Sequence, residues 1–169
     1  MGDVEIWDGY DENGELLGID LIRGEEIPKG VFHLAASVLV KHIDGSYLLM
    51  QRDLSTTWGG YFEATAGGAV LKGETPFIAA IREVKEETGI KIETPVFYDK
   101  GIDVSRQFIL YCYIAETTCD KSAVVLQTGE TMAYKWVDER EFLSFLKSDE
   151  GIPGQCERIS NYLKLIEEE

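Results

Sequence analysis

Residues 68–90 carry the pattern that most restricts what this chain can be. They read GAVLKGETPFIAAIREVKEETGI, with apolar residues recurring at helical spacing in the middle. Thr75 and Pro76 stand where a helix N-cap and first turn belong. Gly89 stands where a helix should end. The segment therefore predicts a helix over residues 76–88.

Three glutamates share one face of this predicted helix. Glu83, Glu86 and Glu87 are spaced i, i+3 and i+4, and such close carboxylates repel one another. A bound divalent cation would remove the repulsion, and oxygen ligands suit Mg²⁺, or Mn²⁺ in its place, better than zinc. A merely solvated acidic face is the alternative. The glycines at 67–68, which permit close backbone approach, and Arg82, which can orient a glutamate, favour a metal site.

Composition narrows the setting of that site. The net charge of −15 argues against general nucleic-acid binding and against attraction to anionic membranes. Neither an apolar run of about 20 residues nor a signal peptide is visible. The three cysteines, Cys112, Cys119 and Cys156, are odd in number and lack metal-ligand spacing. We expect one domain over residues 1–169, in a reduced cytoplasmic setting.

Strand and helix patterns alternate along the rest of the chain. Strands on both sides of one internal helix, with further helices at the C-terminus, predict a mixed sheet between helices. The expected hairpins turn at Asp11–Gly14 and Asp44–Gly45. The expected strands are 4–8, 15–22, 33–43, 46–52, 91–99, 106–116 and 132–137, with a loop and short strand at 58–65, and the expected later helices are 138–147 and 157–167.

Every specified position of segment 68–90 resembles the signature of the Nudix hydrolase family. The resemblance implies an α/β/α sandwich with a mixed sheet. It also implies Mg²⁺-dependent hydrolysis of a diphosphate bond in a nucleoside diphosphate linked to another moiety. Glu83, Glu86 and Glu87, with the Gly67 carbonyl, would hold the metal. Glu74 would orient the loop through Arg82.

The flanking sequence resembles the branch related to isopentenyl-diphosphate isomerase. The similar segments are EIWD at 5–8, DENG at 11–14, GVFHLA at 30–35 and LLMQR at 48–52. In the isomerases a catalytic cysteine precedes the signature glycine and a metal-binding histidine follows it. This chain has Gly67 and Ala69 there, so the sequence favours hydrolysis over isomerisation. A non-catalytic nucleotide-sensing domain is a further alternative, disfavoured by the intact signature.

A later acid completes the predicted catalytic set. Glu130, which precedes the last expected strand, could ligate metal or act as general base, with Glu83 as the alternative base. Glu116 competes with Glu130 for this role. A solvated loop glutamate is the alternative reading of Glu130.

Several other residues are candidate substrate contacts. Arg52, Lys72 and Arg106 could bind the diphosphate. The aromatic residues Trp58, Tyr61 and Phe62 could stack on a nucleobase or belong to the core. We interpret His33 as a structural, hydrogen-bonded histidine, because the partner histidine of the isomerases is missing. The expected partner is a small diphosphate molecule, and the apolar side chains of the hairpin in residues 1–30 could also support a homodimer.

Overall fold

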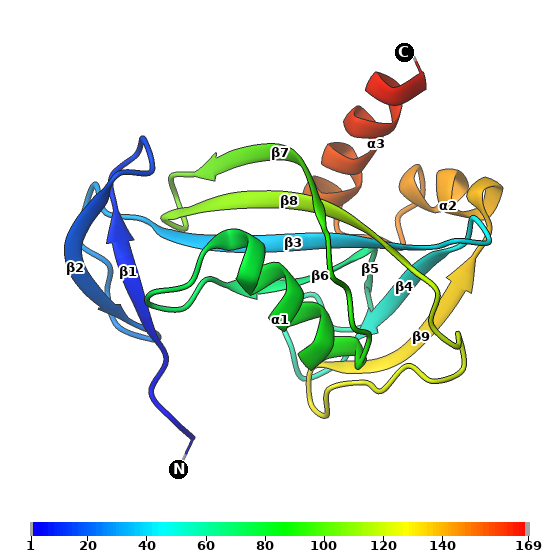
Figure 1. Ribbon diagram of the computed structural model, residues 1–169, viewed down its shortest axis with the longest axis horizontal. Helices are drawn as coiled ribbons and strands as arrows, with labels where there is room; N and C mark the ends of the chain where they lie inside the picture. The colour runs from blue at the N-terminus through cyan, green and yellow to red at the C-terminus, as the bar shows by residue number, and fades with distance from the viewer. Residues whose placement is uncertain (1, 168–169) are drawn as a thin grey trace.

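The computed structural model describes residues 2–167, in which a mixed seven-stranded sheet lies between helices (Figure 1). Helix α1 (Pro76–Thr88) covers one face, whereas α2 (Glu139–Leu146) and α3 (Pro153–Glu167) cover the other. This confirms the predicted fold class. The sheet strands are β3 (His33–His42), β4 (Tyr47–Arg52), β5 (Phe62–Glu63), β6 (Thr65–Ala69), β7 (Val96–Asp103), β8 (Phe108–Thr117) and β9 (Thr131–Val137).

Strand β3 is the centre of the sheet. It runs parallel to β8 along its whole length, and the other strand pairs are antiparallel. The predicted hairpin of β3 and β4 forms, but the two strands are in register only at Lys41 and Tyr47, beside the turn. Farther along, β6 replaces β4 as the partner of β3, pairing with residues 35–39. The glycines of β6 are thereby placed in the middle of the sheet, next to α1.

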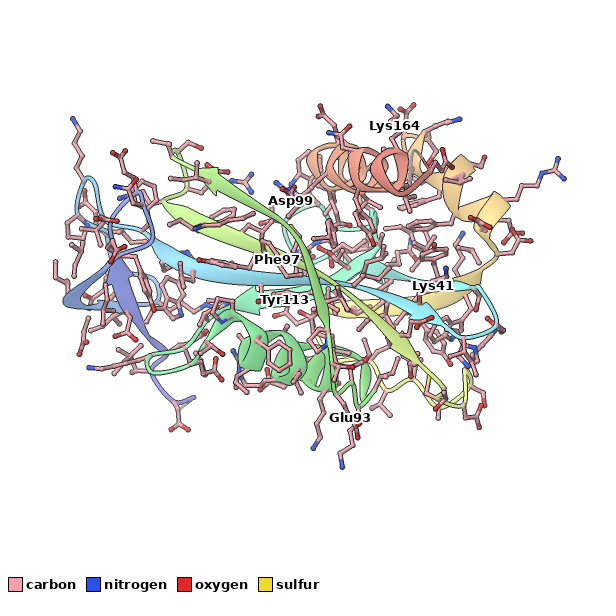
Figure 2. The ribbon with its side chains drawn as sticks, turned by 45° about the horizontal axis from the view of Figure 1, so that its top comes forward. Lys41, Glu93, Phe97, Asp99, Tyr113 and Lys164 are labelled. Carbon is pink, nitrogen blue, oxygen red and sulfur yellow. The ribbon has the colours of Figure 1, made fainter. Side chains whose placement is uncertain are left out.

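The two faces of the sheet bury separate cores. Val38 and Val40 point to the side of α1, whereas Leu39 points to the side of α2 and α3, as the alternation of a strand requires. Because β3 is covered on both faces, its sequence is apolar with only one interruption from Leu34 to Val40. Figure 2 shows Phe97 of β7 beside Tyr113 of β8 on the α1 face, with ring centroids 5.9 Å apart.

Several element boundaries differ from the predictions. The strand expected over 91–99 begins only at Val96, because Pro95 has no N–H to donate to a ladder. Strand β6 was not predicted beyond Thr65, where the expected loop and short strand of 58–65 end. Helix α3 begins at Pro153, about one turn earlier than predicted, since proline suits the first turn of a helix.

The N-terminal hairpin is confirmed as a separate two-stranded sheet of β1 (Ile6–Tyr10) and β2 (Leu16–Ile22), at one end of the molecule (Figure 1). Trp7, Leu21 and Val31 form its small buried core. Its outer strand exposes apolar side chains, among them Leu16 and Leu17. Among residues 2–167, none of the helices combines the length and apolar character needed to cross a bilayer.

Candidate active site

Helix α1 presents the glutamates because both of its ends are fixed by local contacts. The Thr75 hydroxyl accepts a hydrogen bond from the Ile78 N–H at 3.2 Å, and Pro76 occupies the first turn. At the other end Gly89 has φ +74° and donates its N–H to the Lys85 carbonyl. Ala80 and Val84 are fully buried against the sheet. The predicted helix is confirmed, and this register turns the acidic face towards β6.

Arg82 organises the carboxylates around it. Its Nε and Nη2 atoms donate to the two carboxylate oxygens of Glu74 at 2.7 and 3.0 Å. Its Nη1 donates to Glu83 at 2.7 Å and to Glu86 at 3.1 Å. Nη2 also donates to the Ala69 carbonyl at 3.0 Å, which ties the helix to β6. The structure thus brings together the signature residues that the sequence singled out.

The two glycines of β6 allow close contacts, Gly67 with the backbone of β3 and Gly68 with the Glu83 side chain of α1. A Cβ at position 68 would lie 2.5 Å from Oε1 of Glu83, and a Cβ at position 67 would overlap the Ala36 carbonyl oxygen. A larger residue at position 67 would therefore displace the neighbouring strand, whereas one at position 68 would displace the Glu83 carboxylate. The Gly67 N–H donates to Oε2 of Glu87 at 3.2 Å.

Glu87 is a partly buried acid that lies among other carboxylates. Burial raises its pKa well above the usual value, and the charges of Glu83, Glu63 and Glu130 raise it further, against a smaller opposing effect of the Gly67 N–H. Burial also raises the pKa of Glu83, although the Arg82 guanidinium opposes this. The ionised cluster lacks sufficient positive charge, which a divalent cation would supply.

The donor set fits Mg²⁺ in its chemistry, because it consists of hard carboxylate oxygens. Within residues 2–167, no three His, Cys, Asp or Glu side chains are already arranged as a ready-made metal cage. Arg82 explains this, since its Nη1 bridges Glu83 and Glu86. The half-exposed Glu86 side chain has room to rotate away from Arg82 towards a cation.

A cleft of about 540 Å³ opens over these carboxylates. Lys72, a predicted substrate contact, and Glu130, a predicted catalytic residue, both line this cleft. The Nζ of Lys72 contacts the Asp20 carboxylate at 2.6 Å. Residues from the N-terminal hairpin region also line the cleft, although no sequence pattern marked them as site residues. They are Asp3, Val4, Glu5, Ile6, Trp7 and Arg23.

Four predicted substrate contacts do not line the cleft. Arg52 pairs with Glu63 at 2.7 Å, and Arg106 lies in the exposed turn between β7 and β8. Tyr61 packs edge-on against Trp58, and Phe62 packs against the core on the α2 and α3 side while Lys135 lies over its ring. The geometry therefore favours Lys72 over these four.

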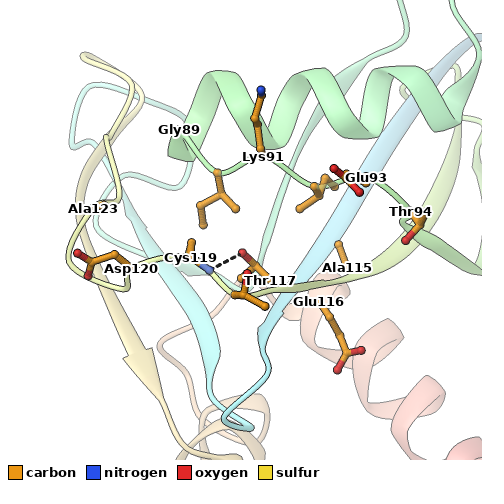
Figure 3. A pocket seen from close by; sticks show the side chains of 13 residues that line it. Gly89, Lys91, Glu93, Thr94, Ala115, Glu116, Thr117, Cys119, Asp120 and Ala123 are labelled. Atoms are coloured by element: carbon orange, nitrogen blue, oxygen red, sulfur yellow. Dashed lines mark hydrogen bonds between the residues drawn. The ribbon is translucent and has the colours of Figure 1, made fainter.

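The structure also shows where two other candidate residues, Glu116 and His33, lie. Glu116 lies in a different hollow, of about 500 Å³, between the end of β8 and the segment after α1 (Figure 3). This favours Glu130 as the late acid. His33 stacks on Trp7 with ring centroids 4.1 Å apart, and its Nδ1 lies 3.2 Å from the Leu34 carbonyl. Burial lowers the pKa of His33, as expected for a packed, neutral histidine.

Comparison with known proteins agrees with this arrangement. The NUDIX domain matches residues 31–154. An uncharacterized Nudix hydrolase of Listeria monocytogenes is 33% identical over 158 residues, covering 89% of each chain. An isopentenyl-diphosphate Delta-isomerase of Corynebacterium diphtheriae is 27% identical over 159 residues, covering 88% of this chain and 86% of its own.

A solved structure shares the fold. The crystal structure of a MutT protein from Methanosarcina mazei superimposes with a TM-score of 0.61 at 22% identity, covering 77% of this chain and 94% of its own. The domain match and the bacterial relative, which extends over most of both chains, show the family. The chain belongs to the Nudix hydrolase family of pyrophosphohydrolases.

Proposed function

We propose that this protein is a Mg²⁺-dependent hydrolase that cleaves the diphosphate bond of a nucleoside diphosphate linked to another moiety. The observation that carries the proposal is the cluster of Glu83, Glu86 and Glu87 at the floor of the cleft, organised by Arg82. Such a floor would repel an anionic substrate unless cations covered it. That charge balance supports a metal-dependent reaction, and membership of the Nudix hydrolase family supports a diphosphate substrate.

Each residue of the floor has a role in this proposal. Glu83, Glu86, Glu87 and the Gly67 carbonyl would hold Mg²⁺, or Mn²⁺ in its place. The bound cation would supply charge neutralisation and activation of water. Glu130 or Glu83 would accept the proton of the attacking water. Arg82 would act as a positioning residue, because its donors contact the carboxylates around it.

Isomerisation of an isoprenoid diphosphate is the second candidate, and the Corynebacterium isomerase relative is the observation that favours it. Gly67 and Ala69 oppose it, because neither can move a proton to or from carbon. Their backbone atoms are also engaged, with the Gly67 N–H on Glu87 and the Ala69 carbonyl on Arg82. A nucleotide sensor without activity remains less consistent with a complete set of signature side chains.

A substrate panel tests the proposal. Nucleoside diphosphate sugars, dinucleotides, nucleoside triphosphates and isoprenoid diphosphates are each incubated with Mg²⁺, with Mn²⁺ and with EDTA, and products are resolved by chromatography. We expect metal-dependent release of a nucleoside monophosphate from at least one nucleoside diphosphate derivative. Cleavage confined to triphosphates, or no cleavage at all, would overturn the assigned substrate class.

Two further predictions accompany this function. Association of two copies through the hairpin is supported by the exposed apolar side chains of β2, including Leu16, Leu17 and Ile19. A cytoplasmic setting is supported by the three free cysteines. Light scattering on wild type and on Leu17→Glu tests the first prediction, and localisation of the tagged chain tests the second.

A further inference from the structure

The N-terminal hairpin forms one wall of the catalytic cleft, and it is fixed to the loop before α1. The Lys72 N–H donates to the Ile6 carbonyl at 2.9 Å, and the Gly73 N–H donates to Oδ2 of Asp8 at 2.9 Å. The Lys72 side chain adds its contact to Asp20 at 2.6 Å. Side chains on this wall therefore have a defined position relative to the glutamates of the floor.

Arg23, at the end of β2, is held on this wall by Glu5. Its Nη1 donates to Oε2 of Glu5 at 2.6 Å, and its backbone N–H donates to the Glu5 carbonyl at 3.0 Å. The other carboxylate oxygen of Glu5 accepts from Nε1 of Trp7 at 3.1 Å. Trp7 in turn is fixed by stacking on His33. The guanidinium is therefore oriented through a chain of packed groups.

Of the three cations that line the cleft, Arg23 has the most donor capacity left. Arg82 directs all three of its nitrogens to oxygen atoms of the signature, and Lys72 is engaged by both oxygens of Asp20. Within residues 2–167, the Arg23 side chain makes one hydrogen bond, to Glu5, and it is 67% exposed. A guanidinium with N–H groups left over is suited to bidentate contact with a phosphate.

The electrostatic surroundings connect Arg23 with the acids of the floor. Its pKa is raised mainly by the hydrogen bond and charge of Glu5, and the charges of Glu130 and Glu83 add to the effect. Arg23 therefore lies within electrostatic reach of the catalytic cluster, although it belongs to a different element. A substrate that spans the cleft would meet carboxylates and metal on one side and this guanidinium on the other.

We propose that Arg23 is a substrate-binding residue, which donates to the phosphate of the diphosphate that water does not attack, while Glu5 positions its guanidinium. The inference rests on the proposed diphosphate hydrolysis. Because the bond between the two phosphates breaks, this phosphate is the leaving group and gains negative charge, so the contact would stabilise the transition state more than the substrate. Loss of the contact would then both raise KM and lower kcat.

The test combines binding and kinetics. Mg²⁺-pyrophosphate is titrated into wild type, Arg23→Ala, Arg23→Lys and the control Arg140→Ala by calorimetry. The same four proteins are assayed on the best substrate of the panel, and their thermal melts are recorded. Arg140 is an exposed cation on α2, on the opposite face of the sheet.

We expect Arg23→Ala to weaken pyrophosphate binding and to raise KM by about tenfold or more, as the loss of a charged hydrogen bond predicts. Its kcat should also fall, whereas its melting temperature should stay near wild type. Lysine should restore part of the loss, since it keeps the charge without the planar fork. Wild-type binding and KM in Arg23→Ala would overturn the inference, as would a clearly lowered melting temperature, which would indicate a structural role.

The two proposals fail in distinguishable ways. If wild type cleaves nothing in the panel, the proposed function fails, while the pyrophosphate titration still reports on Arg23. If wild type cleaves a nucleoside diphosphate derivative and Arg23→Ala behaves as wild type, only the role of Arg23 fails.

Discussion

Glu74 receives two hydrogen bonds from the guanidinium of Arg82, which is placed eight residues farther along the chain. Glu74 also accepts the Leu71 N–H at 3.0 Å. These contacts lower its pKa, although burial acts in the opposite direction. The loop before α1 is thereby tied to the helix by an arginine that also reaches the acidic floor.

Replacing Arg82 by lysine should damage both the fold and the reaction. Lysine keeps the charge, but it cannot donate to Glu74, Glu83 and the Ala69 carbonyl together. We expect a loss of about 1–3 kcal/mol in the free energy of unfolding and at least about a tenfold loss in turnover. Urea denaturation and activity assays measure the two effects. Lys85→Ala, at an exposed position of the same helix, should leave both unchanged.

Removing the charge of the floor glutamates should abolish most of the activity while the fold survives. Glu86→Gln and Glu87→Gln should each lower turnover by at least about a hundredfold, because loss of a ligand removes stabilisation of charge in the transition state. In EDTA, the thermal melts of both variants should differ little from wild type. Near-wild-type turnover in both variants on the best substrate would refute the assigned metal site.

Millimolar Mg²⁺ should raise the melting temperature of the wild type relative to EDTA. The ligand-free cluster is mutually repulsive, and a cation that binds only the native state stabilises it by mass action. Differential scanning fluorimetry over a Mg²⁺ titration measures the shift. The increase should shrink in Glu86→Gln, and identical wild-type melting curves in Mg²⁺ and EDTA would argue against a preformed site.

The protein should not exchange solvent deuterium into isopentenyl diphosphate. Gly67 and Ala69 stand where isomerase-like chemistry would need a thiol and an imidazole, and the cysteines of the chain do not line the cleft. Mass spectrometry after incubation in D₂O with Mg²⁺ measures the exchange. Deuterium incorporation without phosphate release would mean that another residue performs carbon acid–base chemistry.

The cysteines should differ in reactivity. Burial raises the pKa of Cys112 to about 11, and burial also raises that of Cys156, whereas Cys119 is half-buried. At pH 8 a thiol reagent should modify Cys119 first, because the thiolate is the reactive form. The rapid phase should vanish in Cys119→Ser, and rapid labelling of Cys112 would contradict its burial.

Because an unfolded thiol ionises near 9, the contribution of Cys112 to stability should fall as the pH rises from about 9 through 11.

Features that depend on local sequence could be predicted, and those that depend on distant partners could not. Thr75, Pro76 and Gly89 define the ends of α1 through contacts within the helix itself. The strand β6 escaped prediction because its glycines have low strand propensity, and its pairing with β3 is what makes it a strand.

The site shows the same division. The contact of Arg82 with Glu86 follows from their i, i+4 spacing, and that with Glu74 was implied by the resemblance to the Nudix signature, so the floor of the cleft was visible in the sequence. The wall that the N-terminal hairpin forms was not visible in the sequence, because Arg23 reaches the cleft only when the hairpin packs beside the loop before α1. One signal was present: Glu5 and Arg23 flank the paired residues Ile6 and Ile22, where opposite charges can meet across two strands.

The hairpin has its own small core of Trp7, Leu21 and Val31, separate from the two cores beside the main sheet. Its side chains on the cleft can therefore be exchanged without repacking the region that carries the glutamates. Such a division makes the wall a natural place for substrate preference to diverge among related chains, while the chemistry of the floor stays constant. Libraries confined to residues 3–6 and 23, which leave the buried Trp7 in place, would sample new preferences at little cost in stability.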